Sequence, residues 1–219
     1  ARRVYAAARE PAAITAGPLG GLPAIVPVRL DVTDPAQIAA AASAFGDVSL
    51  LVNNAGISRF SALLAADAIA AARAELETNV IGPIATSRAF APALARSGGG
   101  AIINVLSVLS WVTLPPLATY SVSKAAAWAA TNGLRVELRG QRTQVLAVHV
   151  GYMDTDMAAR ADVAKSRPDD IARAVLDALE ADQDELLADA ISNQVKQGLS
   201  APRGVYLGVK AAARRALGA

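Results

Sequence analysis

Short apolar runs alternate along the chain with longer segments rich in helix-forming residues. The apolar runs have the length of β-strands and cover Val4–Ala8, Ala24–Leu30, Leu50–Asn53, Ala101–Leu106, Val145–Val150 and Glu185–Ala188. The segments between them predict helices at Pro35–Phe45, Ala65–Leu94 (as two helices or one long one), Thr119–Arg139 and Pro168–Ala181. Nearly continuous apolar strands that alternate with helices are typical of a parallel sheet covered on both faces. The pattern therefore predicts an α/β fold with a doubly wound sheet in three layers, α/β/α.

Helix starts agree with this pattern. Thr33-Asp34-Pro35 places a capping residue before a proline at the first helical position. Ser166–Asp170 repeats that order and adds two carboxylates in the first turn, at the positive end of the helix dipole. Residues 11–23 are rich in glycine and proline and predict one surface connection. No repeat or linker divides the chain, so we expect a single domain over residues 1–219.

The front of the chain departs from the usual order of a doubly wound sheet. Such a sheet normally begins with a strand, a glycine-rich turn and a helix whose N-terminus binds phosphate groups. Here the first predicted strand begins at Val4, and no glycine-rich turn follows it. We therefore expect that the sequence lacks one βα unit of about 20–30 residues.

The amino-acid composition excludes several classes of protein. Hydrophobic residues make up 53% of the 219 residues, which is enough apolar surface to exclude a disordered chain. The formal net charge is only +2 and no basic cluster is interleaved with aromatic residues, so we expect no nucleic-acid partner. Without cysteine and with His149 as the single histidine, we expect no disulfide, thiol nucleophile or metal site. Glycine, proline and hydroxyl residues interrupt the longest uncharged stretch and no signal peptide opens the chain, so we expect no membrane partner and a cytoplasmic location.

The strongest chemical signal is Tyr120-Ser-Val-Ser-Lys124 on a predicted helix. A spacing of four puts the phenol and the ammonium on one face, and the ammonium is expected to lower the tyrosine pKa from about 10 towards neutrality. Such a tyrosine can give or take a proton at a carbonyl or alcohol oxygen. Ser107 ends a strand thirteen residues earlier and can hydrogen-bond the same oxygen, with Ser110 as an alternative. Asn79 is polar within an apolar helix and can hold a water next to Lys124.

Together with Asn53-Asn54-Ala55-Gly56, these residues resemble the short-chain dehydrogenase/reductase family in its simple single-domain branch. The resemblance extends to about Ser200 and implies a Rossmann-like fold. By this resemblance Tyr120 is the general acid/base, Lys124 binds the nicotinamide ribose and lowers the tyrosine pKa, Ser107 orients the substrate, and Asn79 supports a proton relay. The resemblance also implies a cofactor site made by Asp31, Val32, Asn53, Ala55, Gly56, Tyr120, Lys124, Gly151, Met153 and Thr155.

Three details of the resemblance concern the ends of this site. The Asp31-Val32 pair is implied to hold the adenine, and Met153 and Thr155 the carboxamide end of the cofactor. Val150 stands where the family has proline, which is expected to loosen the following turn. Residues 156–167 fall where the family places its substrate lid, and residues 201–219 are expected to form a C-terminal tail.

The choice of cofactor rests on Arg9. In such folds an acidic residue after the second strand binds the ribose 2′-hydroxyl, whereas a nearby arginine accommodates a 2′-phosphate. Ala8 takes the acidic position and Arg9 follows it, so we expect NADP(H) to be preferred over NAD(H). Arg9 as a solvated loop charge is the alternative.

These observations predict an oxidoreductase that acts reversibly on a small-molecule carbonyl or alcohol. The long helices around Asn79 and Tyr120 resemble the pair that forms dimers in the family, so a homodimer or homotetramer is expected. The alternatives are a non-catalytic NADP-binding or sensing protein, an inactive truncated family member, and an epimerase or dehydratase. His149 ends an apolar strand and is expected to be structural, with its hydrogen bonds satisfied, rather than catalytic.

Overall fold

The computed structural model describes residues 2–17, 20–159 and 161–207 of the chain. Its strands are β1 (Val4–Ala8), β2 (Ile25–Arg29), β3 (Leu50–Asn53), β4 (Ala101–Val105), β5 (Gln144–His149) and β6 (Glu185–Leu187). Every strand pair is parallel, in the orders β1-β2 and β3-β4-β5-β6. The predicted parallel sheet is therefore confirmed, and each predicted strand is found within one or two residues of its expected bounds.

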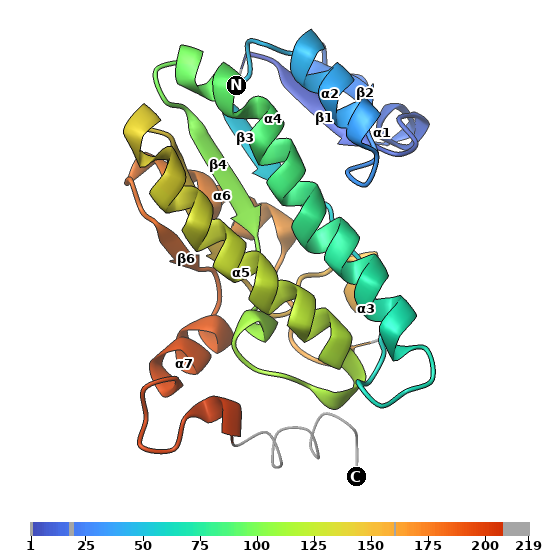
Figure 1. Cartoon of the computed structure of the whole chain (residues 1–219), viewed down its shortest axis with the longest axis vertical. Coiled ribbons are helices and arrows are strands. Elements are labelled where there is room, and N and C mark those ends of the chain that lie inside the picture. Colours follow the sequence, from blue (N-terminus) through green and yellow to red (C-terminus); the bar gives the residue numbers. More distant parts are fainter. Residues whose placement is uncertain (1, 18–19, 160, 208–219) are drawn as a thin grey trace.

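Helices cover both faces of the larger sheet. They are α1 (Ala12–Ala16), α2 (Pro35–Ala44), α3 (Ala68–Leu76), α4 (Gly82–Arg96), α5 (Ala118–Leu138), α6 (Pro168–Glu180) and α7 (Ala190–Gly198). Helices α4 and α5 lie side by side across one face, and α6 lies behind the other (Figure 1). Successive side chains of β5 lie on opposite faces of the sheet. Val145 packs towards α4 and α5, whereas Leu146 packs towards α6. This confirms the three-layer α/β/α fold.

The sheet is in two pieces. Within the described residues no pairing joins β1 to β3, and Val52 on β3 is 50% exposed. The β1–β2 unit is attached through α2, which packs on α4, and through Tyr5, whose ring stacks on Phe45 with 4.2 Å between centroids (Figure 1). Ligands of doubly wound folds bind outside the carboxyl ends of the strands, at the point where the strand order reverses.

Some elements differ from the expectation. The predicted surface connection 11–23 contains α1, because alanine-rich residues lie between Pro11 and Gly17. The segment Ala65–Leu94 forms α3 and α4, joined by the π turn Glu77–Ile81. Asp34 caps α2 as predicted, but Arg167 occupies the N-cap of α6 without a side-chain bond.

Helix α7 was not predicted, and the 3₁₀ turn Val205–Leu207 ends the described chain. The rest of the expected tail, residues 208–219, lies outside the described residues. No helix in the described part of the chain has both the length and the apolar character needed to cross a membrane.

Candidate active site

The predicted site residues gather where the parallel strands end. Each follows the carboxyl end of a strand or lies on the helices packed beside these ends: Arg9 after β1, Asp31 and Val32 after β2, Asn53–Gly56 at the end of β3, Ser107 after β4, Gly151 after β5, Asn79 between α3 and α4, and Tyr120 and Lys124 on α5. The carboxyl edge is where doubly wound folds bind their ligands. The residues therefore share one edge of the molecule.

Tyr120 and Lys124 lie one turn apart on α5, as predicted from their spacing. The Lys124 Nζ is 5.6 Å from the centroid of the Tyr120 ring. Lys124 is buried, and its ammonium donates to the carbonyl oxygen of Val105 at 2.9 Å. This bond anchors the lysine to the end of β4.

Ser107, rather than Ser110, lies beside the phenol. The Ser107 hydroxyl lies close enough to the phenol to lower the pKa of Tyr120, against the larger effect of burial. The Ser107 Oγ also accepts from the backbone amide of Leu109 at 3.1 Å. The hydroxyl of Ser110 is buried without a hydrogen-bond partner among the described residues. Of the two candidates from the sequence, Ser107 therefore has the contact needed to share an oxygen with Tyr120.

Asn79 occupies the π turn and ties three segments together. Its Oδ1 accepts from the Ile57 amide at 2.8 Å, and its Nδ2 donates to the Ile57 carbonyl at 2.9 Å and to the Ser123 Oγ at 2.9 Å. A Cβ at Gly56 would lie 3.3 Å from the Asn79 Oδ1 and 3.8 Å from the Lys124 Nζ. The backbone at Gly56 thus fits closely against both side chains. Such π turns are frequent at functional sites because they redirect one side chain.

The pKa of Tyr120 is raised in this structure, not shifted towards neutrality as the neighbouring Lys124 led us to expect. Burial raises the pKa of Tyr120 well above its usual value, the charge of Glu75 raises it further, and the bond from Ser107 only partly opposes them. Burial also lowers the pKa of Lys124 to about 8. The spacing of four in the sequence correctly predicts that the phenol and the ammonium are close together. Burial, however, favours the neutral form of each group, and this effect is larger than the attraction between their charges.

Asn53 has a structural network of its own. Its Nδ2 donates to Asn104 at 2.8 Å and to Ser87 at 3.1 Å, and its Oδ1 accepts from Thr86 at 2.7 Å. The side chain therefore joins β3 to β4 and α4. A small internal cavity lies among Asn53, Ala55, Asn79, Lys124 and their neighbours.

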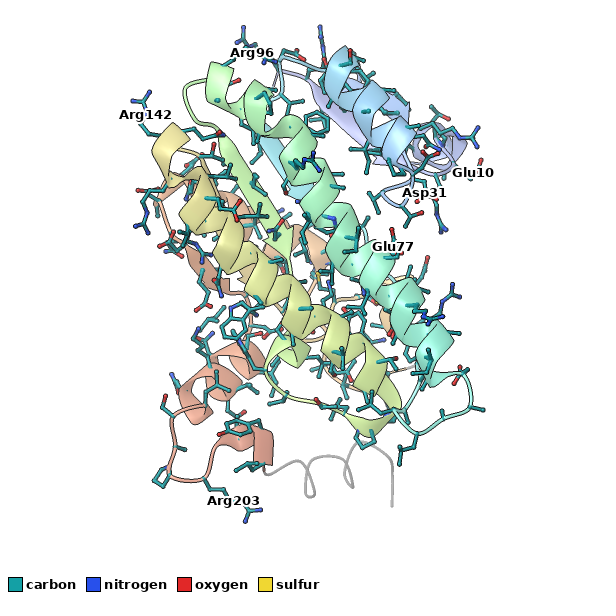
Figure 2. The ribbon with its side chains drawn as sticks, viewed as in Figure 1. Glu10, Asp31, Glu77, Arg96, Arg142 and Arg203 are labelled. Atoms are coloured by element: carbon teal, nitrogen blue, oxygen red, sulfur yellow. The ribbon has the colours of Figure 1, made fainter. Side chains whose placement is uncertain are left out.

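At the opposite end of the site, Arg9 is exposed directly after β1 and lies within electrostatic reach of Asp31. The pKa of Asp31 is lowered, mainly by the hydrogen bond from the Thr33 amide and in smaller part by the charge of Arg9. Figure 2 shows Asp31 at the end of the β1–β2 unit. Val32 packs on α4, because a Cβ at Gly82 would lie 2.9 Å from its Cγ2.

The turn after β5 is held by a residue far along the chain. The Gly151 amide donates to the Asp189 Oδ2 at 2.6 Å. Met153 pairs with Ser166 in a parallel bridge, so the expected lid segment 156–167 begins and ends near one place. Thr155 is exposed, and its hydroxyl lies 3.5 Å from the Met153 carbonyl oxygen.

A sequence model of the short chain dehydrogenase family matches residues 2–166, which include every predicted site residue. The chain belongs to the short-chain dehydrogenase/reductase family. The resemblance seen in the sequence is thereby confirmed.

Individual members of the family support this assignment. A short chain dehydrogenase from Burkholderia cenocepacia in complex with NADP superposes with a TM-score of 0.87 at 42% identity, over 97% of this chain and 86% of that chain. An NADPH-bound carbonyl reductase from chicken fatty liver gives a TM-score of 0.73 at 28% identity, over 81% of this chain and 80% of that chain. The bovine dehydrogenase/reductase SDR family member 7B is 35% identical over 141 residues, or 63% of this chain. The chain spans 43% of the length of that bovine relative.

Sequence reasoning missed two polar residues of this family member's site. Glu75 on α3 is fully buried, its Oε1 accepts from the Arg59 amide at 2.6 Å, and its Oε2 has no hydrogen-bond partner among the described residues. Asp189 caps α7 by accepting from the Ser192 amide at 2.8 Å, besides holding Gly151. The sequence could have indicated Asp189 as a helix cap, because an aspartate there precedes a helix-forming segment. Nothing in the sequence shows that Glu75 rather than Glu77 is the buried carboxylate.

Proposed function

We propose that the chain is an NADP(H)-dependent oxidoreductase that interconverts a carbonyl compound and a secondary alcohol. The observation that carries this proposal is that Ser107 and the buried Lys124 both lie beside Tyr120. A hydroxyl, a phenol and an ammonium in this arrangement can hold one substrate oxygen and move one proton to or from it. NADP(H), when bound, supplies or accepts the hydride.

The proposed role of each residue is consistent with its contacts. Tyr120 gives a proton to the substrate oxygen in reduction and takes it in oxidation. Ser107 donates to the same oxygen and holds it in place. Lys124 lies beneath the phenol and is proposed to hold the nicotinamide ribose, and Asn79 fixes the loop around Ile57. The raised pKa of Tyr120 favours the neutral phenol, which is the form that acts as an acid.

The described residues fit a nicotinamide dinucleotide at its two ends. The exposed Arg9 beside Asp31 suits the 2′-phosphate and ribose of the adenosine half. Ala55 and Lys124 line a small cavity, and the Gly56 backbone lies close to Lys124. These residues suit the other half of the cofactor, together with Gly151, Met153 and Thr155. Relatives that bind NADP or NADPH support this choice of cofactor. The preference for NADP(H) over NAD(H) is proposed on Arg9.

A self-associating surface is part of the proposal. Apolar side chains are exposed on the run from α3 to α5, among them Ile69 at 67% and Val136 at 67%. Exposed apolar residues on neighbouring helices favour burial against a second copy. We propose a homodimer or homotetramer, and residues 156–167 as a short lid over the substrate. The cytoplasmic location stays a prediction.

The first test is a fluorescence titration with NADPH, with NADH in parallel, followed by assays of Tyr120→Phe. We expect NADPH to bind more tightly than NADH. Tyr120→Phe removes the transferable proton but leaves the cofactor contacts, so it should abolish turnover and retain NADPH binding. Near-normal turnover by Tyr120→Phe would contradict the proposal. Failure of both nucleotides to bind would instead favour an inactive member of the family.

A further inference from the structure

His149 is the last residue of β5 and lies behind the predicted catalytic serine. Its side chain is fully buried, and its ring stacks on Trp111 with 3.8 Å between centroids at an interplanar angle of 21°. The chain contains no other histidine. The ring takes no direct part in the proposed reaction, so its surroundings need a separate explanation.

One ring nitrogen contacts Ser107. The His149 Nδ1 is 3.2 Å from the carbonyl oxygen of Ser107, which also accepts from the Ser110 amide at 3.0 Å. A carbonyl oxygen can only accept, so a hydrogen bond here requires the proton on Nδ1. His149 then donates to the backbone of the residue whose hydroxyl lies beside Tyr120.

The other ring nitrogen faces an ion pair. The His149 Nε2 lies 3.5 Å from the Glu185 Oε1 on β6 and has no hydrogen-bond partner among the described residues. The Glu185 carboxylate accepts from the Lys196 Nζ at 2.8 and 2.6 Å. The same ammonium lies 4.9 Å from the centroid of the Trp111 ring. Lys196 therefore offsets a carboxylate charge that would otherwise attract a proton to Nε2.

The charged groups around the ring come from three elements. Glu185 on β6 favours the protonated ring, whereas Lys196 on α7 and Lys124 on α5 oppose it. Burial is the largest influence and lowers the pKa of His149 to about 4. The ring is therefore neutral at physiological pH, with one proton to place on one of two nitrogens.

We propose that His149 is a positioning residue for Ser107, with the proton of its neutral ring on Nδ1. Trp111 stacks on the ring, and Lys196 offsets the Glu185 charge that would otherwise draw this proton to Nε2. This rests on the role proposed above for Ser107. It makes β6 and α7 a support for the serine, because both members of the ion pair come from that part of the chain (Figure 1). The expectation of a structural histidine with satisfied hydrogen bonds is corrected in one respect, since Nε2 is left without a partner.

The first arm of the test is ¹⁵N NMR of the imidazole in the whole chain, where the single histidine makes the assignment unambiguous. We expect a protonated Nδ1 and a bare Nε2, unchanged from about pH 8 to about pH 5, although a free histidine titrates near 6.5. Lys196→Met leaves Glu185 without its counter-ion and should move the titration to higher pH. An Nε2–H tautomer, a charged ring at neutral pH, or an unchanged titration in Lys196→Met would overturn the proposal.

The second arm observes the Ser107 carbonyl directly. Only Ser107 and Ser121 precede a valine, so ¹³C-carbonyl serine with ¹⁵N-valine gives two correlations, one for the test and one as internal control. His149→Leu removes the donor and should shift the Ser107 carbonyl but not that of Ser121. His149→Asn carries an amide N–H near the position of Nδ1 and should return the signal towards its wild-type position. A Ser107 carbonyl that is the same in His149→Leu and wild type would overturn the contact.

The third arm tests whether the contact between His149 and Ser107 affects the rate of the reaction. With NADPH and acetophenone or cyclohexanone as probe ketones, His149→Leu should lower kcat by about tenfold or more while the KM for NADPH stays unchanged, and His149→Asn should recover most of it. Equal kcat in His149→Leu and an active wild type would overturn the positioning role. If no variant, wild type included, reduces either ketone while both NMR arms behave as expected, the proposed function fails and the contact stands.

Discussion

Tyr120 and Lys124 illustrate at the residue scale how one environment acts on two groups. Removal from water favours the neutral form of each, so the phenol keeps its proton more firmly and the ammonium loses its proton more easily. The sequence predicted that these residues are neighbours, since a spacing of four on a helix fixes that. Their pKa values depend on burial and on Glu75, which come from other parts of the chain and are invisible in the Tyr-Lys motif.

Lys124→Met should stabilise the fold at neutral pH. The lowered pKa of about 8 corresponds to a penalty of about 3 kcal/mol for the buried ammonium, and its hydrogen bond to Val105 offsets about 1 kcal/mol. The penalty is fully present below pH 8, where both states hold the proton. It disappears as pH rises to about 10.4, because the folded lysine is then neutral while the unfolded one still binds the proton.

Urea denaturation at several pH values checks this prediction. We expect Lys124→Met to raise the free energy of unfolding by about 2 kcal/mol at pH 7, with the gain shrinking between pH 8 and pH 10. Lys165→Met, at a lysine that is only partly buried, is the matched control and should leave the pH dependence unaltered. A Lys124→Met variant less stable than wild type at pH 7 would contradict the argument.

Glu75→Gln should lower the pKa of Tyr120. A negative charge beside a phenol disfavours the phenolate, and the amide removes that charge while retaining an oxygen for the Arg59 amide. The measurement is a ¹³Cζ-tyrosine NMR titration, with Tyr120→Phe to assign the signal. Glu77→Gln is the control, because Glu77 is exposed two residues further along the same helical run (Figure 2). Equal shifts in the two variants would show that Glu75 has no specific influence.

At the scale of elements, the strands and the long helices follow from the alternation of apolar and polar residues. Three features of the structure do not follow from this alternation. The π turn around Asn79 has no signature in the hydrophobic pattern, and the hydrogen bonds that Asn79 makes there join it to the distant Ile57 and Ser123. Helix α1 is too short to show a period. Helix α7 is mostly polar, and its stability depends on the Asp189 cap and on packing against the turn after Ser107.

The Asp189 side chain gives an element-scale prediction. Asp189→Ala loses both the cap of α7 and the bond to Gly151, and should lower the free energy of unfolding by about 2 kcal/mol. Asp189→Asn keeps one carbonyl oxygen, so it should destabilise less while still disturbing Gly151. Because Gly151 belongs to the proposed cofactor site, both variants should weaken NADPH binding.

Asp34→Ala is the matched control for this prediction, because Asp34 caps α2 and makes no contact with Gly151. It should lower the denaturation midpoint and weaken NADPH binding by less than Asp189→Ala, because Asp34 reaches the proposed site only through Gln37, which accepts from the Asp31 amide. Equal effects of the two alanine variants on NADPH affinity would mean that Asp189 acts only as a helix cap.

At the scale of the whole molecule, the two-piece sheet divides the proposed cofactor site. Arg9 and Asp31 lie on the β1–β2 unit, whereas Gly56, Ser107 and Lys124 belong to the larger body. The sequence predicted every strand that the structure describes. It could not predict how these strands pair, because strand pairing depends on contacts between distant segments.

Hydrogen exchange should therefore differ between the two pieces. Strand β5 is paired on both sides and buried between helix layers, whereas β1 is paired on one side among the described residues and its unit is attached through α2. Local opening needs least free energy where few contacts must break, so β1 and β2 amides should exchange faster than those of β4 and β5.

NADPH that contacts both pieces should slow the exchange of β1 and β2 more than that of β4 and β5. Equal protection of the two pieces without NADPH would contradict the division, and slowing confined to β4 and β5 would place the cofactor on the larger body alone.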